Sequence, residues 1–137
     1  MKILSVLLFI TFLSCKTSEM KSSQEMFTSG KYEVLSMDGM QFSEQEDYKI
    51  RIDTTKKYLS GKFDCNEFGV EYDLTENNTL NFGFARATKM YCEGEMDLEN
   101  KFFRIVNSMT IFKYKKGELS FYNTNKDLVL KLKKIES

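Results

Sequence analysis

Short runs of alternating apolar and polar residues fill the chain from residue 31 onward, and this period of two constrains the fold more than any other feature of the sequence. Successive side chains of a β-strand point to opposite faces of a sheet, so each run predicts a strand with one buried face. The runs cover residues 32–34, 48–52, 58–63, 70–74, 80–84, 111–114, 119–122 and 128–132. No proline interrupts them, and we expect a mainly β domain.

Turn residues separate these runs. The asparagine pair at residues 77–78 tolerates the positive φ of a tight turn and predicts a hairpin at that point. Residues 115–117 and 123–125 join the last three runs into a meander. Because strands and helices do not alternate along the chain, a parallel α/β fold is not expected.

Only residues 96–109 break the period of two. Their apolar residues recur at spacings of three and four, the period of an amphipathic helix: Leu98, Phe102, Phe103, Ile105, Val106 and Met109. Four carboxylates gather near its start and favour the positive end of the helix dipole: Glu93, Glu95, Asp97 and Glu99. We predict a mainly β (α+β) fold, a single antiparallel open β-barrel or strongly twisted sheet, with one helix near residues 96–108.

The first fourteen residues are typical of a secretory signal peptide. Lys2 precedes an apolar run over residues 3–13, which is too short to span a bilayer core of roughly 30 Å but suits a signal. The run ends in Phe-Leu-Ser-Cys, which resembles the lipobox of bacterial lipoproteins with Phe12 in place of the usual leucine. We predict cleavage before Cys15 and acylation of its thiol; the alternative is a chance cysteine beside an ordinary signal peptide.

Acylation, with palmitate among the chains, would hold the protein at a membrane without a transmembrane helix. Residues 15–29 are rich in Ser, Thr, Lys and Glu and predict a lipid-anchored flexible tether. Residues 30–137 suffice for one domain with one core. Lys16 is not the aspartate that retains some lipoproteins in the inner membrane, so we expect a cell-envelope protein, with the outer membrane favoured.

The charge balance argues against nucleic acid as a partner. The chain has 20 basic and 20 acidic residues, and no long basic block. The predicted partners are the membrane, through the lipid on Cys15, and a second envelope protein or component. We expect a monomer.

Histidine is absent, which removes the side chain that most often serves as general base or metal ligand near neutral pH. A zinc site would need more ligands than Cys65 and Cys92 supply, so no metal or cofactor is predicted. In an oxidising compartment these two cysteines favour a structural disulfide. Two buried free thiols, or a redox pair activated by a basic neighbour such as Lys89, are the alternatives.

Two motifs carry a family resemblance: residues 59–68 (LSGKFDCNEF), followed by Tyr72, and residues 87–92 (ATKMYC). With the acidic helix start at Leu98 and Glu99 they resemble the META-domain, or HslJ-like, family, in which a Gly-x-x-x-Cys-Asn stretch precedes a Thr-x-Met-x-Cys stretch. The resemblance covers about residues 30–135. Its motif positions are Gly61, Asn66, Tyr72, Thr88, Met90 and Glu99.

Two positions depart from the family pattern. Asp64 stands where the family usually has glycine before the Cys-Asn pair, and Tyr32 stands where it usually has tryptophan. From the residues themselves, we expect Asn66 to bond the backbone in a turn and Thr88 to complete a bulge or strand pair. The carboxylates near the helix start are explained by the helix dipole without catalysis.

The resemblance implies a compact antiparallel β domain with a helix, frequent on envelope lipoproteins, linked in some members to stress tolerance and without an established reaction. Our first hypothesis is therefore a non-enzymatic envelope lipoprotein that binds another envelope component or contributes to the stress response. The second is a carrier of a small apolar ligand in an aromatic interior. The third is a thiol–disulfide active protein. Seven phenylalanines are expected either to fill the core or, under the second hypothesis, to line a ligand cavity: Phe63, Phe68, Phe82, Phe84, Phe102, Phe112 and Phe121.

Overall fold

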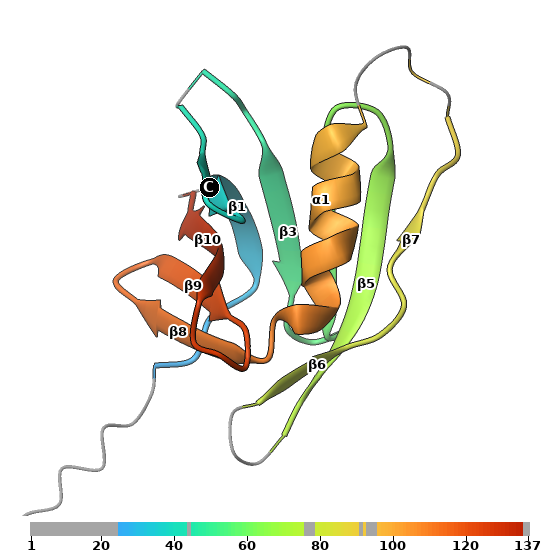
Figure 1. The fold of residues 1–137 in the computed structure, drawn as a ribbon. Coiled ribbons are helices and arrows are strands. Elements are labelled where there is room, and N and C mark those ends of the chain that lie inside the picture. Colours follow the sequence, from blue (N-terminus) through green and yellow to red (C-terminus); the bar gives the residue numbers. More distant parts are fainter. Residues whose placement is uncertain (1–24, 44, 76–78, 91, 93–95, 136–137) are drawn as a thin grey trace, which may run out of the picture.

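A computed structural model describes residues 25–43, 45–75, 79–90, 92 and 96–135. Within these residues, ten antiparallel strands form one strongly curved sheet (Figure 1). The strands are β1 (Gly30–Met37), β2 (Met40–Gln41), β3 (Lys49–Asp53), β4 (Tyr58–Lys62), β5 (Glu67–Leu74), β6 (Leu80–Phe82), β7 (Arg86–Ala87), β8 (Ile111–Lys115), β9 (Glu118–Tyr122) and β10 (Leu128–Lys134). The predicted mainly β fold is confirmed.

The strand order makes the sheet nearly closed. It runs β6-β5-β4-β3-β1-β10-β9-β8, so the first and the last strand of the chain lie side by side in the middle, while β2 pairs with β1 and β7 with β5. The two ends of this order meet where Thr79 forms a bridge with Ile111 and the N–H of Leu80 donates to the carbonyl of Thr110 at 2.8 Å. The result is an open antiparallel barrel, as predicted.

Large side chains on the inward faces of the strands fill the barrel. The largest fully buried ones are Tyr32, Met37, Ile50, Ile52, Leu59, Leu80, Phe102, Met109, Phe112, Leu119, Phe121 and Leu130. Phe27 belongs to the same core, although it precedes β1: its ring lies 5.0 Å from that of Phe112. The packed part of the chain therefore begins at least three residues before Gly30.

Figure 1 shows the helix between β3 and β5, running roughly along these two strands. It comprises α1 (Asp97–Ile105), which continues into the 3₁₀ turn η1 (Val106–Ser108), in agreement with the prediction over residues 96–108. Phe102 is fully buried, and its ring lies 4.4 Å from Phe68 and 5.5 Å from Phe63. No helix among the described residues is long and apolar enough to cross a membrane.

The hairpin between β5 and β6 is confirmed, because Leu74 pairs with Leu80; residues 77–78 themselves lie outside the described part. The predicted strand over residues 80–84 was too long. It ends at Phe82, and Phe84 is 92% exposed instead of belonging to the core. The apolar alternation extends two residues beyond the paired strand, because Gly83 and Phe84 belong to the connection between β6 and β7. The strand β7 has only two residues, too few to show an alternation in the sequence.

Candidate functional site

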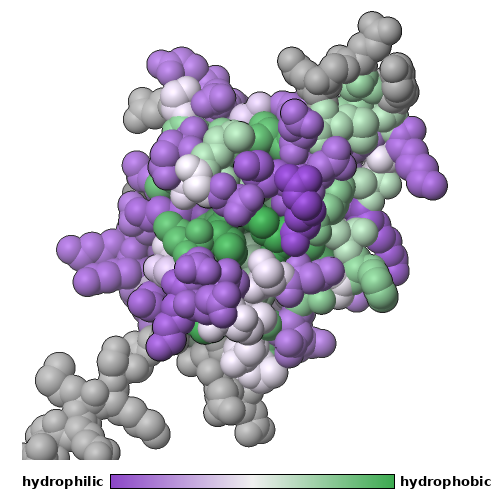
Figure 2. Space-filling view, viewed as in Figure 1, coloured by the Kyte–Doolittle hydropathy of each residue, from purple (hydrophilic) through white to green (hydrophobic). Residues whose placement is uncertain are grey.

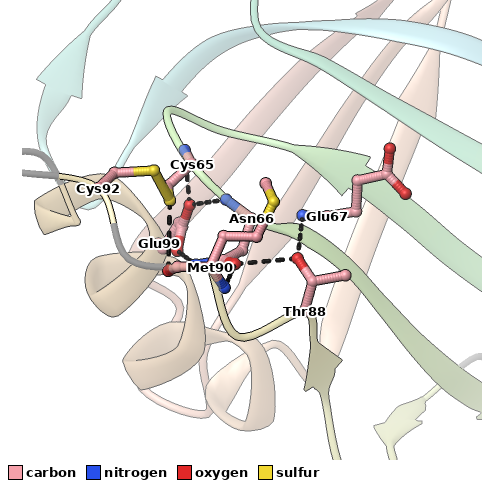
Figure 3. Close-up of a disulfide and its surroundings, with 7 residues drawn as sticks. All are labelled: Cys65, Asn66, Glu67, Thr88, Met90, Cys92 and Glu99. Atoms are coloured by element: carbon pink, nitrogen blue, oxygen red, sulfur yellow. Dashed lines mark hydrogen bonds between the residues drawn. A yellow bond between two sulfur atoms is a disulfide. The ribbon is translucent and has the colours of Figure 1, made fainter.

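A disulfide joins the loop after β4 to the segment that leads into the helix. Cys65 and Cys92 are linked with their Cα atoms 6.0 Å apart, and the bridge closes a loop of 27 residues in sequence separation (Figure 3). Cys65 is buried and Cys92 is half-buried. Of the three states considered for these cysteines, the structure has the disulfide.

Asn66 lies at the centre of the network around this disulfide (Figure 3). Its Oδ1 accepts the N–H of Met90 at 2.8 Å and the hydroxyl of Thr88 at 2.9 Å. Its Nδ2 donates to Oε2 of Glu99 at 2.9 Å. The buried amide of Asn66 therefore joins three elements: the loop between β4 and β5, the segment after β7, and helix α1.

Thr88 completes the pairing at the end of β7. Its N–H donates to the carbonyl of Glu67 at 3.0 Å, and its hydroxyl oxygen accepts the N–H of Glu67 at 3.1 Å. The side chain thus replaces a backbone acceptor where the strand pairing of β5 and β7 stops. It also orients the Asn66 amide, because the same hydroxyl donates to it.

Glu99 is the buried anion of the site. It is 1% exposed, and its Oε1 accepts the N–H groups of Cys65, at 2.8 Å, and of Asn66. As the third helical residue it is in the position from which a glutamate usually caps its own helix, yet α1 has no side-chain cap. The carboxylate instead binds the loop that carries the disulfide.

Hydrogen bonding decides the charge state of Glu99. Burial raises its pKa, but the hydrogen bonds from the backbone and side chain of Asn66 and from Cys65, with the charge of Lys62, outweigh this effect and leave the pKa of Glu99 below its ordinary value. Glu99 is thus ionised at neutral pH with both oxygens engaged.

Glu99 corrects the sequence-based interpretation of the carboxylate cluster. We expected four carboxylates that stabilise the helix dipole in solvent; Asp97 is exposed, but Glu99 points inward. Glu93 and Glu95 lie outside the described residues. The sequence did hold an indication, because Glu99 shares a helix face with Phe102 and Val106, at spacings of three and seven.

The remaining motif residues serve packing around this network. A Cβ on Gly61 would lie 2.8 Å from both the Lys49 carbonyl oxygen and the Phe68 ring, so only glycine allows β4 to approach β3 there. Tyr72 is buried in the core, which raises its pKa to about 12. Met90 contributes its backbone, while its side chain is half exposed.

The two departures from the family pattern have local explanations. Asp64 needs no positive φ; its carboxylate accepts the hydroxyl of Tyr48 at 2.7 Å. Tyr32 is fully buried like a core aromatic residue, and its hydroxyl donates to the carbonyl of Thr28 at 2.6 Å. Each of the two side chains thus takes part in a hydrogen bond of its own.

The network around the disulfide is suited to hold three chain segments together. A thiol–disulfide catalyst needs an accessible thiolate, whereas Cys65 is buried and the Glu99 carboxylate binds its N–H, which disfavours a second negative charge nearby. No group of three or more potential metal ligands occurs in the described part of the chain. We call Cys65, Asn66, Thr88, Cys92 and Glu99 the clasp.

A second site lies on the sheet edge at β7. Tyr58, Gly69, Gly83, Phe84 and Arg86 line a pocket of about 250 Å³ together with Glu71. The ring of Tyr58 covers Gly69, where a Cβ would lie 1.7 Å from the tyrosine oxygen. Tyr58 and Phe84 are both exposed, so two aromatic rings border this pocket. Sequence reasoning missed it because it placed Phe84 in the core.

The model of the META domain family matches residues 13–135. An NMR structure of a protein from Burkholderia xenovorans is similar, with a TM-score of 0.60 at 15% identity over 80% of this chain and 84% of that chain. A crystal structure of a DUF4847 family protein from Bacteroides vulgatus ATCC 8482 has a TM-score of 0.59 at 10% identity, over 82% and 96%. These likenesses show the fold alone. No curated protein matches the chain.

Proposed function

Because the chain belongs to the META domain family, we propose that it is a non-enzymatic bacterial envelope lipoprotein whose domain binds another envelope protein. The observation that carries this proposal is the exposure of Phe84, which is 92% exposed between two strands. Covering such a ring contributes roughly 1.5–3 kcal/mol. The proposal gives Phe84 the role of an anchor that a partner covers.

The surroundings of Phe84 support a protein as the partner. The strand β7 pairs with β5 and with no other described strand, so one of its edges is open. Figure 2 shows apolar surface along the side of the molecule where β5 and β7 lie. Arg86 and Glu71 at the rim of the pocket add polar groups. An extended segment paired with β7 would reach all of these groups at once.

The two rival functions have less support. A carrier needs space inside the barrel, whereas the rings of Phe63, Phe68 and Phe102 lie 4.4–5.5 Å apart in its interior. Four pockets among the described residues, the one at β7 included, are each lined in part by exposed residues of the outer surface. A thiol–disulfide activity is disfavoured by the buried position of Cys65 in the clasp. A role in stress tolerance is compatible with a binding domain.

The anchoring half of the proposal is tested at Cys15, which lies outside the described residues. We expect the chain, expressed with its signal peptide in bacteria, to incorporate labelled palmitate and to be found in the outer-membrane fraction. Cys15→Ser should lose the label, because the other two cysteines form the disulfide. Label that persists in Cys15→Ser would contradict acylation at this residue, and label found with the inner membrane would contradict the favoured location.

The binding half is tested by a photo-crosslinking amino acid placed at residue 84. We expect one discrete crosslinked envelope protein in cells, since an anchor ring lies within contact distance of its partner. The matched control is Met40 in β2, which is 42% exposed and remote in the strand order from β7. The same adducts from residues 84 and 40, or none from either, would overturn the proposal.

The variant Phe84→Ser separates binding from folding. Because the ring is almost fully exposed, its removal should change the free energy of unfolding by no more than about 0.5 kcal/mol. Loss of binding to the protein found by crosslinking, at unchanged stability, is the expected result. Unchanged affinity would show that Phe84 is not the anchor.

A further inference from the structure

The outward faces of β8, β9 and β10 form a shallow basic groove of about 620 Å³. Five lysines and one glutamate contribute its charge: Lys113, Lys115, Lys116, Lys131, Lys133 and Glu118. The chain as a whole has equal numbers of basic and acidic residues, and folding brings the pair Lys131 and Lys133 beside the local cluster of Lys113, Lys115 and Lys116. We call this surface the lysine groove.

The strand register explains how the lysines gather. Ser120 of β9 pairs with Lys113 on one side and Lys131 on the other, and Glu118 pairs with Lys115 and Lys133 in the same way. Strands lie about 4.8 Å apart, so the backbones of the two outer lysines in each row are about 10 Å apart. Two such rows, two residues apart along the strands, surround an area of the size of a phosphate-bearing headgroup.

Most of this charge is not neutralised within the described residues. Glu118 forms an ion pair with Lys131 at 3.0 Å, and the Nζ of Lys113 lies 5.1 Å from the centre of the Tyr122 ring. Lys115 and Lys133 flank the same glutamate without an ion pair to any described residue. Like charges on one face disfavour each other, and an anion bound between them would relieve this repulsion.

Two of the strands that carry the groove, β8 and β10, contact the residues just before β1. Phe27 packs against Phe112 of β8, and the hydroxyl of Thr28 accepts a hydrogen bond from Lys134 of β10 at 2.6 Å. In Figure 1 the first described residues, coloured blue, pass beside β8 on their way to β1. The ten residues after Cys15 span at most about 35 Å when fully extended. A lipid on Cys15 would therefore hold the start of the described chain, and the domain with its groove, within tens of ångströms of a bilayer.

We propose that the lysine groove docks on the anionic phospholipid headgroups of the membrane that holds the lipid anchor. This inference rests on the proposed function for its setting, because the anchor supplies the nearby bilayer. Stable attachment takes two signals, an acyl chain and a basic patch being one such pair. Tyr122 and Leu128, which also line the groove, would meet the interface between headgroups and acyl chains.

The test uses the chain from residue 15 with Cys15→Ser, so that binding cannot come from an acyl chain; all core residues lie between Phe27 and Leu132 and are retained. It is sedimented with phosphatidylcholine vesicles that either contain or lack phosphatidylglycerol. We expect binding only to the anionic vesicles, and weaker binding as salt is added. A lack of binding to anionic vesicles, or equal binding to both kinds, would overturn the proposal.

A triple variant, Lys113→Gln with Lys115→Gln and Lys133→Gln, removes exposed charges from the groove and should weaken binding by about tenfold or more. The matched control carries Lys31→Gln, Arg51→Gln and Lys56→Gln, three exposed basic residues on β1, on β3 and in the turn after β3. It has the same net charge and should bind nearly as the parent does. Equal losses in both variants would show a non-specific charge effect and refute the docking face.

The outcome is independent of the anchoring experiment. If the unacylated chain binds anionic vesicles but palmitate labelling fails, the docking of the lysine groove is supported and the lipoprotein proposal is refuted. If labelling succeeds and the vesicles are not bound, acylation at Cys15 is supported and the docking of the lysine groove on headgroups is refuted.

Discussion

Replacing Glu99 with alanine is expected to lower the free energy of unfolding by about 3–5 kcal/mol, the largest effect of any single substitution at the clasp. The change leaves the N–H groups of Cys65 and Asn66 and the side-chain amide of Asn66 without their acceptor in a buried place. Urea-induced unfolding measures the difference. The matched control is Asp97→Ala, an exposed carboxylate two residues earlier in α1, which should cost no more than about 1 kcal/mol.

The same carboxylate should make stability depend on pH in the acid range. The pKa of Glu99 is lowered by folding, so its contribution is fully present above the pKa of the unfolded chain, about 4.3, and is lost as the pH falls through the lower folded pKa. The loss between pH 5 and pH 3 should be smaller in Glu99→Gln than in the parent chain. Identical pH profiles would mean that Glu99 is not the ionised acceptor.

Removing the disulfide by Cys65→Ala with Cys92→Ala is expected to lower the free energy of unfolding by about 3 kcal/mol, because the bridge closes a loop of 27 residues in the unfolded chain. The parent chain measured with a reductant that has opened the bridge should unfold like the variant. Hydrogen exchange should show the greatest loss of protection after β7, where the hydrogen bonds of Thr88 and Met90 to Asn66 and of Thr88 to Glu67 remain without the covalent bridge.

Two results would contradict this structural role. A double variant as stable as the parent would mean that the clasp holds without the bridge. Rapid reduction of the native chain under conditions in which it stays folded would instead return the cysteine pair to consideration as a reactive centre.

The periodicity of the sequence predicted the fold class and most of its elements. Alternation marks strands because side chains of one strand face a common core, and the change to spacings of three and four marked α1 for the same reason. The motif residues Asn66 and Thr88 were also identified from the sequence, together with the cysteine pair. Their partners across the fold were not, since Asn66 and Glu99 are 33 residues apart.

The sequence by itself thus determined eight of the ten described strands, the helix and the two cysteines of the domain, because these depend on local patterns and on residue chemistry; β2 and β7, two residues each, are too short to show a period. Only the tertiary structure decided which side chains meet. It turned Glu99 into the buried acceptor of the clasp, put Phe84 in solvent at the β7 edge, and gathered Lys113 and Lys131, which are 18 positions apart, on one face. Strand order and register determine these contacts between residues that are distant in the sequence, and neither can be read from the period of a single segment.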